Sequence, residues 1–85
     1  MNEQIELGRI LLTEAISQSI PRIEIIGFLG RHRNRNYGLT REEDCKLNDT
    51  EGERVHSIYD SSQGRIWIIT EEDRSCTTVL YPEEY

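Results

Sequence analysis

The chain has 85 residues, 35% hydrophobic and 31% charged, with a formal net charge of −6 at pH 7. This length predicts one domain over residues 1–85. The negative charge disfavours direct nucleic-acid binding, because phosphate repels it, and no apolar run approaches the roughly 20 residues of a membrane span. The N-terminus does not form a signal peptide, so we expect a cytoplasmic protein with reduced thiols.

Residues 3–19 carry apolar side chains at helical spacing. Ile5, Leu12 and Ile16 fall on one stripe, and neighbouring leucines widen it. This pattern predicts an N-terminal helix that lies across a sheet, with Asn2 as a candidate N-cap.

The next segment, residues 22–29, is ambiguous. Its β-branched residues favour a strand, whereas Ser19 as a cap and Pro21 in the first turn favour a second helix. Residues 30–38 are rich in Asn and Gly, which predicts a loop.

A capping box at residues 40–43 predicts a short acidic helix. Thr40 would accept from the amide of Glu43, and the helix would end before Gly52. We expect Cys45 and Leu47 to face inward.

Three strand-like segments follow, at residues 54–59, 65–70 and 76–81. The short connections at 60–64 and 71–75 predict an antiparallel arrangement. Because the middle segment is apolar on both faces, we expect it to be central and covered on both sides. The predicted fold is α+β, with N-terminal helices packed on a three-stranded antiparallel β-meander. Either a further helix or a second subunit would cover the second face.

Positive charge is concentrated in one part of this acidic chain. Residues 22–41 contain five arginines and one glutamate, a net of 5 − 1 = +4. The remainder therefore carries −6 − 4 = −10, so the charge is strongly asymmetric along the chain.

Several motifs resemble a family of small bacterial proteins found in cyanobacteria and on plasmids and phages. The matching stretches are F-L-G-R-H at 28–32, Y-G at 37–38 and I-W-I-I-T-E-E-D-R-S-C-T-T-V-L-Y-P-E-E-Y at 66–85. The family's G-D-W-G is replaced here by N-R-N-Y-G at 34–38. The resemblance implies a helix over 23–31 and a mobile-element setting, and it implies no activity.

His32, Arg74 and Thr78 are candidates for catalysis. A helical half followed by a sheet with these residue types is similar to barnase-like and colicin-like ribonuclease toxins. There, His would act as acid or base, Arg would stabilise the phosphorane charge, and Thr would position phosphate. The alternative is structural: His32 ends a helix, Arg74 pairs with neighbouring acids, and Thr78 is an ordinary strand residue. The acidic charge favours this alternative.

The leading hypothesis is a non-enzymatic, acidic protein-interaction module of a mobile genetic element. Its expected partner is a host protein with a basic nucleic-acid-binding surface, such as a CRISPR effector complex, which it would inhibit as an anti-CRISPR-like protein. A homodimeric structural protein is a further alternative. No metal or cofactor is predicted, because the two cysteines match no ligand spacing. The predicted partner-binding residues are Glu71, Glu72, Asp73, Glu83, Glu84 and Tyr85, with Arg31, Arg33 and Arg35 of the basic segment.

Overall fold

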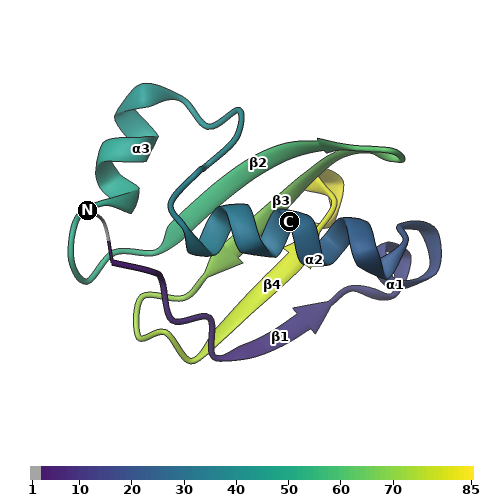
Figure 1. The fold of residues 1–85 in the computed structure, drawn as a ribbon, viewed down its shortest axis with the longest axis horizontal. Helices are drawn as coiled ribbons and strands as arrows, with labels where there is room; N and C mark the ends of the chain where they lie inside the picture. The colour runs from purple at the N-terminus through teal and green to yellow at the C-terminus, as the bar shows by residue number, and fades with distance from the viewer. Residues whose placement is uncertain (1–2) are drawn as a thin grey trace.

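The computed structural model describes residues 3–85, which form an α+β fold of three α-helices and a four-stranded mixed sheet (Figure 1). No helix within these residues is long and apolar enough to cross a membrane. The elements are β1 (Arg9–Leu12), α1 (Glu14–Ser19), α2 (Arg22–Arg33), α3 (Glu42–Asn48), β2 (Val55–Ser61), β3 (Gly64–Thr70), β4 (Cys76–Leu80) and a 3₁₀ helix (Pro82–Glu84).

The strand order is β1-β4-β3-β2. The antiparallel β2-β3-β4 meander is confirmed, and β3 is central as predicted. A fourth strand, β1, adds to β4 in parallel, so the predicted three-stranded sheet was incomplete. Figure 1 shows α2 crossing one face of the sheet and α3 lying at the end where β2 begins.

The predicted helix over 3–19 is wrong for its first eleven residues, 3–13. Gly8 has a φ of +62°, and a Cβ there would clash with the main-chain oxygens of Arg74 and Ser75. The chain after Gly8 therefore runs beside β4 as a strand. A helix begins only after Thr13, whose hydroxyl accepts from the amide of Ile16 at 3.3 Å. The proposed cap Asn2 lies outside the described residues.

The helical alternative for residues 22–29 is confirmed, and α2 continues through Arg33. The predicted loop is therefore wrong over residues 30–33. His32 is the reason for the extension, since it turns inward and is fully buried against the sheet. Ser19 does not cap α2, because its hydroxyl donates to the carbonyl of Ala15 at 2.6 Å.

The acidic helix α3 is confirmed, but its predicted capping box is wrong. The Thr40 hydroxyl donates to the carbonyls of Tyr37 and His56 instead. Leu47 is 53% exposed, so its predicted inward position is also wrong. Asn48 is buried in its place, and its amide group holds the main chain of His56 through bonds of 2.8 and 2.9 Å.

The main core lies between α2 and one face of the sheet. Trp67, on the other face, contacts the rings of His56 and Tyr85 at centroid distances of 4.5 and 5.4 Å. The C-terminal tail therefore helps to cover the second face of β3. The main core consists of Ile16, Ile20, Ile25, Tyr59, Ile66, Ile68 and Val79, with Phe28 and Leu29 packed against it.

A chain of hydrogen bonds crosses this core. The Thr77 hydroxyl must donate to the carbonyl of Leu7 (2.7 Å), so it accepts from Thr70 (2.7 Å). Thr70 then accepts from Nε2 of His32 (2.8 Å), and Nδ1 of His32 accepts from Ser57 (2.6 Å). All four side chains are fully buried.

The hydrogen-bond pattern requires His32 to be neutral, because its Nδ1 accepts a hydrogen bond from Ser57. Burial lowers the pKa of His32 to about 4, together with the charges of His56, Arg74 and Arg35.

We expect His32 to make the stability of the fold depend on pH. Below about pH 6.5 the imidazole of His32 becomes protonated in the unfolded chain. In the folded chain it stays neutral down to about pH 4, so protonation favours the unfolded state in this range. The free energy of unfolding should therefore drop by about 3 kcal/mol across this window. Urea unfolding at several pH values measures the drop. His32→Gln should lose this component, and an equal pH-dependent loss in that variant would contradict the assignment.

Candidate functional site

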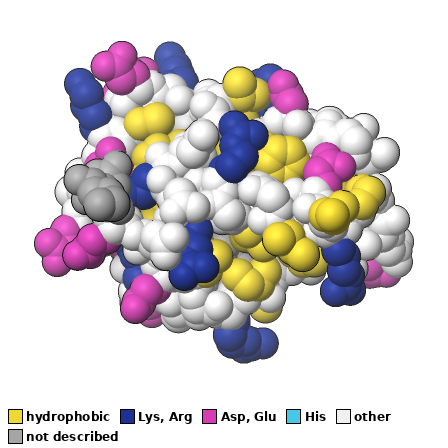
Figure 2. All heavy atoms as spheres, in the orientation of Figure 1, with side chains coloured by type: hydrophobic (Ala, Val, Ile, Leu, Met, Phe, Trp, Pro, Cys, Tyr) yellow, Lys and Arg dark blue, Asp and Glu magenta, His cyan; other side chains and the backbone are white. Residues whose placement is uncertain are grey.

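Two hollows adjoin at the end of the sheet beside α3, and Glu72 lines both. Their volumes are 320 and 770 Å³, and we call them the smaller and the larger hollow. Figure 2 shows acidic side chains gathered at this end, on the left of the view. The carboxylates that line the hollows, together called the acidic end, are Glu3, Glu6, Asp44, Asp49, Glu51, Glu53 and Glu72.

The smaller hollow combines apolar walls with an acidic rim. Leu47, Ile69 and the ring of Tyr85 supply the apolar surface, and the rim includes Asp44 and Glu72. Leu47 and Tyr85 are 53% and 69% exposed, so both present apolar surface to solvent. This combination suits a ligand that has an apolar stem and a cationic head.

His56 also lines the smaller hollow. Its Nε2 is buried and has no hydrogen-bond partner within residues 3–85. Burial lowers the pKa of His56, and the charge of Arg54 lowers it further, while Asp44 opposes both. The imidazole is therefore neutral near pH 7, and it adds no positive charge to the acidic end.

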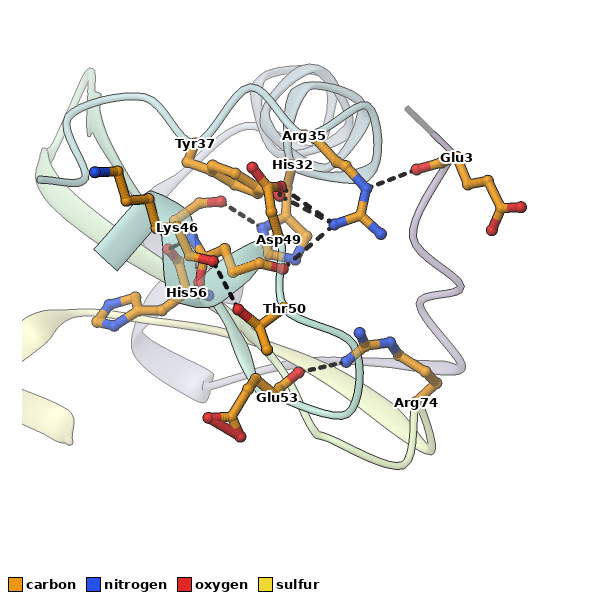
Figure 3. Close-up of polar contacts among 12 residues, drawn as sticks. Glu3, His32, Arg35, Tyr37, Lys46, Asp49, Thr50, Glu53, His56 and Arg74 are labelled. Carbon is orange, nitrogen blue, oxygen red and sulfur yellow. Dashed lines mark hydrogen bonds and ion pairs between the residues drawn. The ribbon is translucent and has the colours of Figure 1, made fainter. Parts of the chain in front are cut away.

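Arg35 organises the larger hollow (Figure 3). Its Nε donates to the carbonyl of Glu3 at 2.7 Å, and its Nη1 donates to the Tyr37 hydroxyl at 3.1 Å. The same Nη1 lies 3.5 Å from the carboxylate of Asp49. One half-buried guanidinium thus joins the N-terminal segment to the end of α3 and fixes the two walls of the hollow.

Tyr37 completes this network by donating to Asp49 at 2.6 Å. Burial and the hydrogen bond to Asp49 raise the pKa of Tyr37 to about 12, despite the opposing effect of Arg35. The phenol therefore stays protonated at physiological pH and acts as a fixed donor.

Arg74 also has a structural role. It has a φ of +62° in the turn before β4, and its Nη1 donates to the carbonyls of Glu53 (2.8 Å) and Glu71 (3.3 Å). Its expected pairing with acidic side chains of that turn is replaced by main-chain contacts. Arg35 and Arg74 are therefore both held in place by the fold, and their two positive charges offset part of the negative charge of the larger hollow.

The three candidate catalytic residues do not converge. His32 is fully buried on the α2 side of the sheet. The side chain of Thr77 lies on the same side, because it bonds to Thr70. Side chains alternate along a strand, so Thr78 points to the opposite side. Arg74 is held in the turn by carbonyl groups. The structure therefore assembles no accessible His–Arg–Thr site from these residues.

The predicted partner-binding acids fall into three environments. Glu72 and Asp73 are exposed, and Glu72 lines both hollows. Glu71 lies 3.6 Å from Nε of Arg54. Glu84 is structural, because it accepts from the Thr13 hydroxyl and the Tyr81 amide.

The remaining predicted contacts are dispersed. Glu83 is exposed but lines neither hollow, whereas Tyr85 walls the smaller one. Arg31 lies over the Tyr59 ring at 4.9 Å, and Arg33 is exposed at the end of α2. Only Glu72, Tyr85 and Arg35 of the predicted set line the two hollows.

The prediction missed most of the acidic end. Asp44, Asp49, Glu51 and Glu53 follow one another in α3 and its following loop, and this acidic run was visible in the sequence. It meets the turn at 71–73 because Val55 pairs with Thr70, whereas Glu3 and Glu6 join through the path of the N-terminal segment, which was predicted as a helix. Within residues 3–85, no three His, Cys, Asp or Glu side chains lie close enough to hold a metal ion.

Comparison with family models, with curated proteins and with solved structures gives no match for this chain. The resemblance of residues 66–85 to small plasmid and phage proteins therefore stays a prediction. Functional inference rests on the geometry and charge of the two hollows.

We expect Arg35→Ala to reduce the free energy of unfolding by about 2 kcal/mol, because two partly buried hydrogen bonds and the bond to Glu3 would lose their donor. Urea unfolding measures this change. Arg33→Ala, two residues away and exposed, is the matched control and should stay within about 0.5 kcal/mol of the wild type. Equal effects of the two substitutions would show that Arg35 does not organise the hollow.

Proposed function

We propose that this chain is an acidic protein-interaction module whose acidic end binds a basic surface of a partner protein. The observation that carries the proposal is the convergence of seven carboxylates on two adjoining hollows. The arginines in the same linings are Arg35, Arg54 and Arg74, and all three are engaged within the chain. The lining charge is therefore −7 + 3 = −4.

Such a surface suits a site built for phosphate. A nucleic-acid-binding protein presents arginines and lysines at the spacing of a phosphate backbone, and fixed carboxylates compete for the same cations. The proposed partner is a basic host protein in the cytoplasm, such as a defence nuclease of the CRISPR effector type. The proposed consequence of binding is inhibition, because the occupied surface is no longer open to nucleic acid.

The smaller hollow adds chemical selectivity to this charge. An arginine side chain from the partner would lay its stem against Leu47 and its guanidinium near the Tyr85 ring, within reach of Asp44 and Glu72. A lysine ammonium is more strongly hydrated and cannot stack in this way. The geometry therefore favours an arginine as the anchor.

The two alternative functions have less support. A ribonuclease would need His32 to reach its substrate, and that side chain is fully buried with both ring nitrogens occupied. A homodimer through the second sheet face would have to displace the tail, because Tyr85 already packs against Trp67.

Charge reversal at the acidic end should abolish the interaction. Glu72→Lys and Glu51→Lys should each weaken binding to a guide-RNA-loaded CRISPR effector complex about tenfold, because each replaces attraction by repulsion. Co-migration in size-exclusion chromatography and inhibition of nuclease activity measure the effect. Association of the wild type should also slow as ionic strength rises.

Glu83→Lys is the matched control, since it makes the same change in net charge at an exposed residue outside both hollows. It should bind like the wild type. If Glu83→Lys and Glu72→Lys weakened binding equally, the effect would come from net charge alone, and binding could not be assigned to the acidic end. Absence of both co-migration and inhibition with the wild type would contradict the proposed inhibition of this partner class.

The arginine preference of the smaller hollow is tested with peptides of nine arginines and nine lysines. We expect the wild type to bind the arginine peptide several-fold more tightly by calorimetry, because guanidinium stacks on Tyr85. Tyr85→Ala should remove this preference, whereas Tyr85→Phe retains the ring and should keep it. An arginine preference that persists in Tyr85→Ala would exclude the smaller hollow as its source.

A further inference from the structure

The outer side of β1 is a free sheet edge. β1 pairs with β4, and no other strand of the described chain lies beyond it (Figure 1). The amides of Arg9 and Thr13 donate to carbonyls of the β4 side at 3.1 and 3.2 Å. Because parallel strands bond through every second residue, the N–H and C=O groups of Ile10 and Leu12 point away from β4. These groups can pair with one more strand.

An apolar groove lies directly beside this edge. A cavity of 260 Å³ between β1 and α2 is lined by Ile10, Leu12, Arg22, Ile25, Ile26 and Leu29. Ile10 and Ile26 are 43% and 66% exposed. Figure 2 shows hydrophobic side chains gathered on the face that carries α2 and β1. A second hollow, of 570 Å³, extends from Ile10 to Arg33 along the N-terminal segment, and we call the two together the β1 groove.

The β1 groove has a charge opposite to that of the chain. Arg22 and Arg33 stand at its two ends, against one lining carboxylate, Glu6. Neither arginine has an ion pair within residues 3–85. They are the first and last residues of α2, so their main chains are about 16 Å apart at 1.5 Å per residue.

We propose that an extended, acidic segment of a second protein adds to β1 as a fifth strand. Its main chain would pair with Ile10 and Leu12, and alternate apolar side chains would enter the β1 groove. Two acidic residues of the added strand, on the same face and six positions apart, would be about 20 Å from each other and would reach Arg22 and Arg33. The recognised pattern is therefore acid–x–apolar–x–apolar–x–acid. This binding is separate from that of the acidic end and does not depend on it.

A second copy of this chain fits the β1 groove less well. Antiparallel pairing of two β1 strands would bring Arg22 and Arg33 of each copy to the same interface. Like charges that face each other across an interface oppose association. Charge complementarity therefore selects an acidic segment over self-association.

The test starts from a display library of random nine-residue peptides, selected against the wild-type protein. The enriched peptides should share the acid–apolar pattern and should protect the amides of Ile10 and Leu12 from hydrogen exchange. Ile26→Asp should weaken their binding at least tenfold. Ile23→Asp is the matched control, because Ile23 is 82% exposed on the same helix and does not line the groove. Glu72→Lys should bind these peptides like the wild type.

Reversing the charge of the two arginines tests for a gain of binding to basic peptides. The double substitution Arg22→Glu with Arg33→Glu should reverse the preference, so that peptides with lysine at the two acidic positions bind better. Failure to enrich any acidic, apolar pattern would overturn the proposal, as would equal binding to Ile26→Asp. A dimer in sedimentation, with the amides of Ile10 and Leu12 protected in the free protein, would assign the edge to a second copy instead.

Discussion

The hydrogen-bond chain through His32 is the constraint on which the rest of the structure depends. It joins β2, α2, β3, β4 and the N-terminal segment, in that order, from Ser57 to the carbonyl of Leu7. Thr70 and Thr77 each donate and accept, and both nitrogens of His32 are bonded, so each buried polar side chain in this network has a partner. Aliphatic side chains of similar volume would fill the space but would not select which strand and helix meet there. The chain thus fixes the register of α2 against the sheet.

The N-terminal segment follows from this constraint, and both proposed binding surfaces follow from the segment. Thr77 holds it at Leu7, and Arg35 holds it at Glu3. Residues 4–6 then line the larger hollow on one side and the β1 groove on the other. A segment without regular secondary structure is therefore the shared wall between an acidic surface and a basic, apolar one.

The meander, α3 and the helical alternative for α2 were predictable because their signals are local: alternation, turn residues and the position of Pro21. The caps proposed at Ser19 and Thr40 were wrong. β1 was not, because three consecutive apolar residues at 10–12 fit a helix and a strand equally well. The deciding feature is Gly8, whose left-handed φ lets the main chain approach the turn before β4. The acidic end escaped prediction in part for the same reason, since Glu3 and Glu6 join it only when β1 lies beside β4. The pairing of Val55 with Thr70 brings its other two segments together. His32 was singled out in the sequence as a catalytic candidate, but its burial could not be read from a position within an apparent loop.

The separation of charge on this molecule has a physical consequence for function. A chain of net charge −6 repels acidic partners at long range, so the β1 groove gains little from electrostatic steering. Its binding depends instead on short-range contacts, which are apolar packing, main-chain pairing and the ion pairs with Arg22 and Arg33. The first two of these are barely affected by salt. The acidic end behaves in the opposite way, because its carboxylates are exposed and reinforce the overall charge. The two surfaces therefore differ in salt dependence as well as in ligand chemistry, and this difference separates their contributions in any complex that engages both.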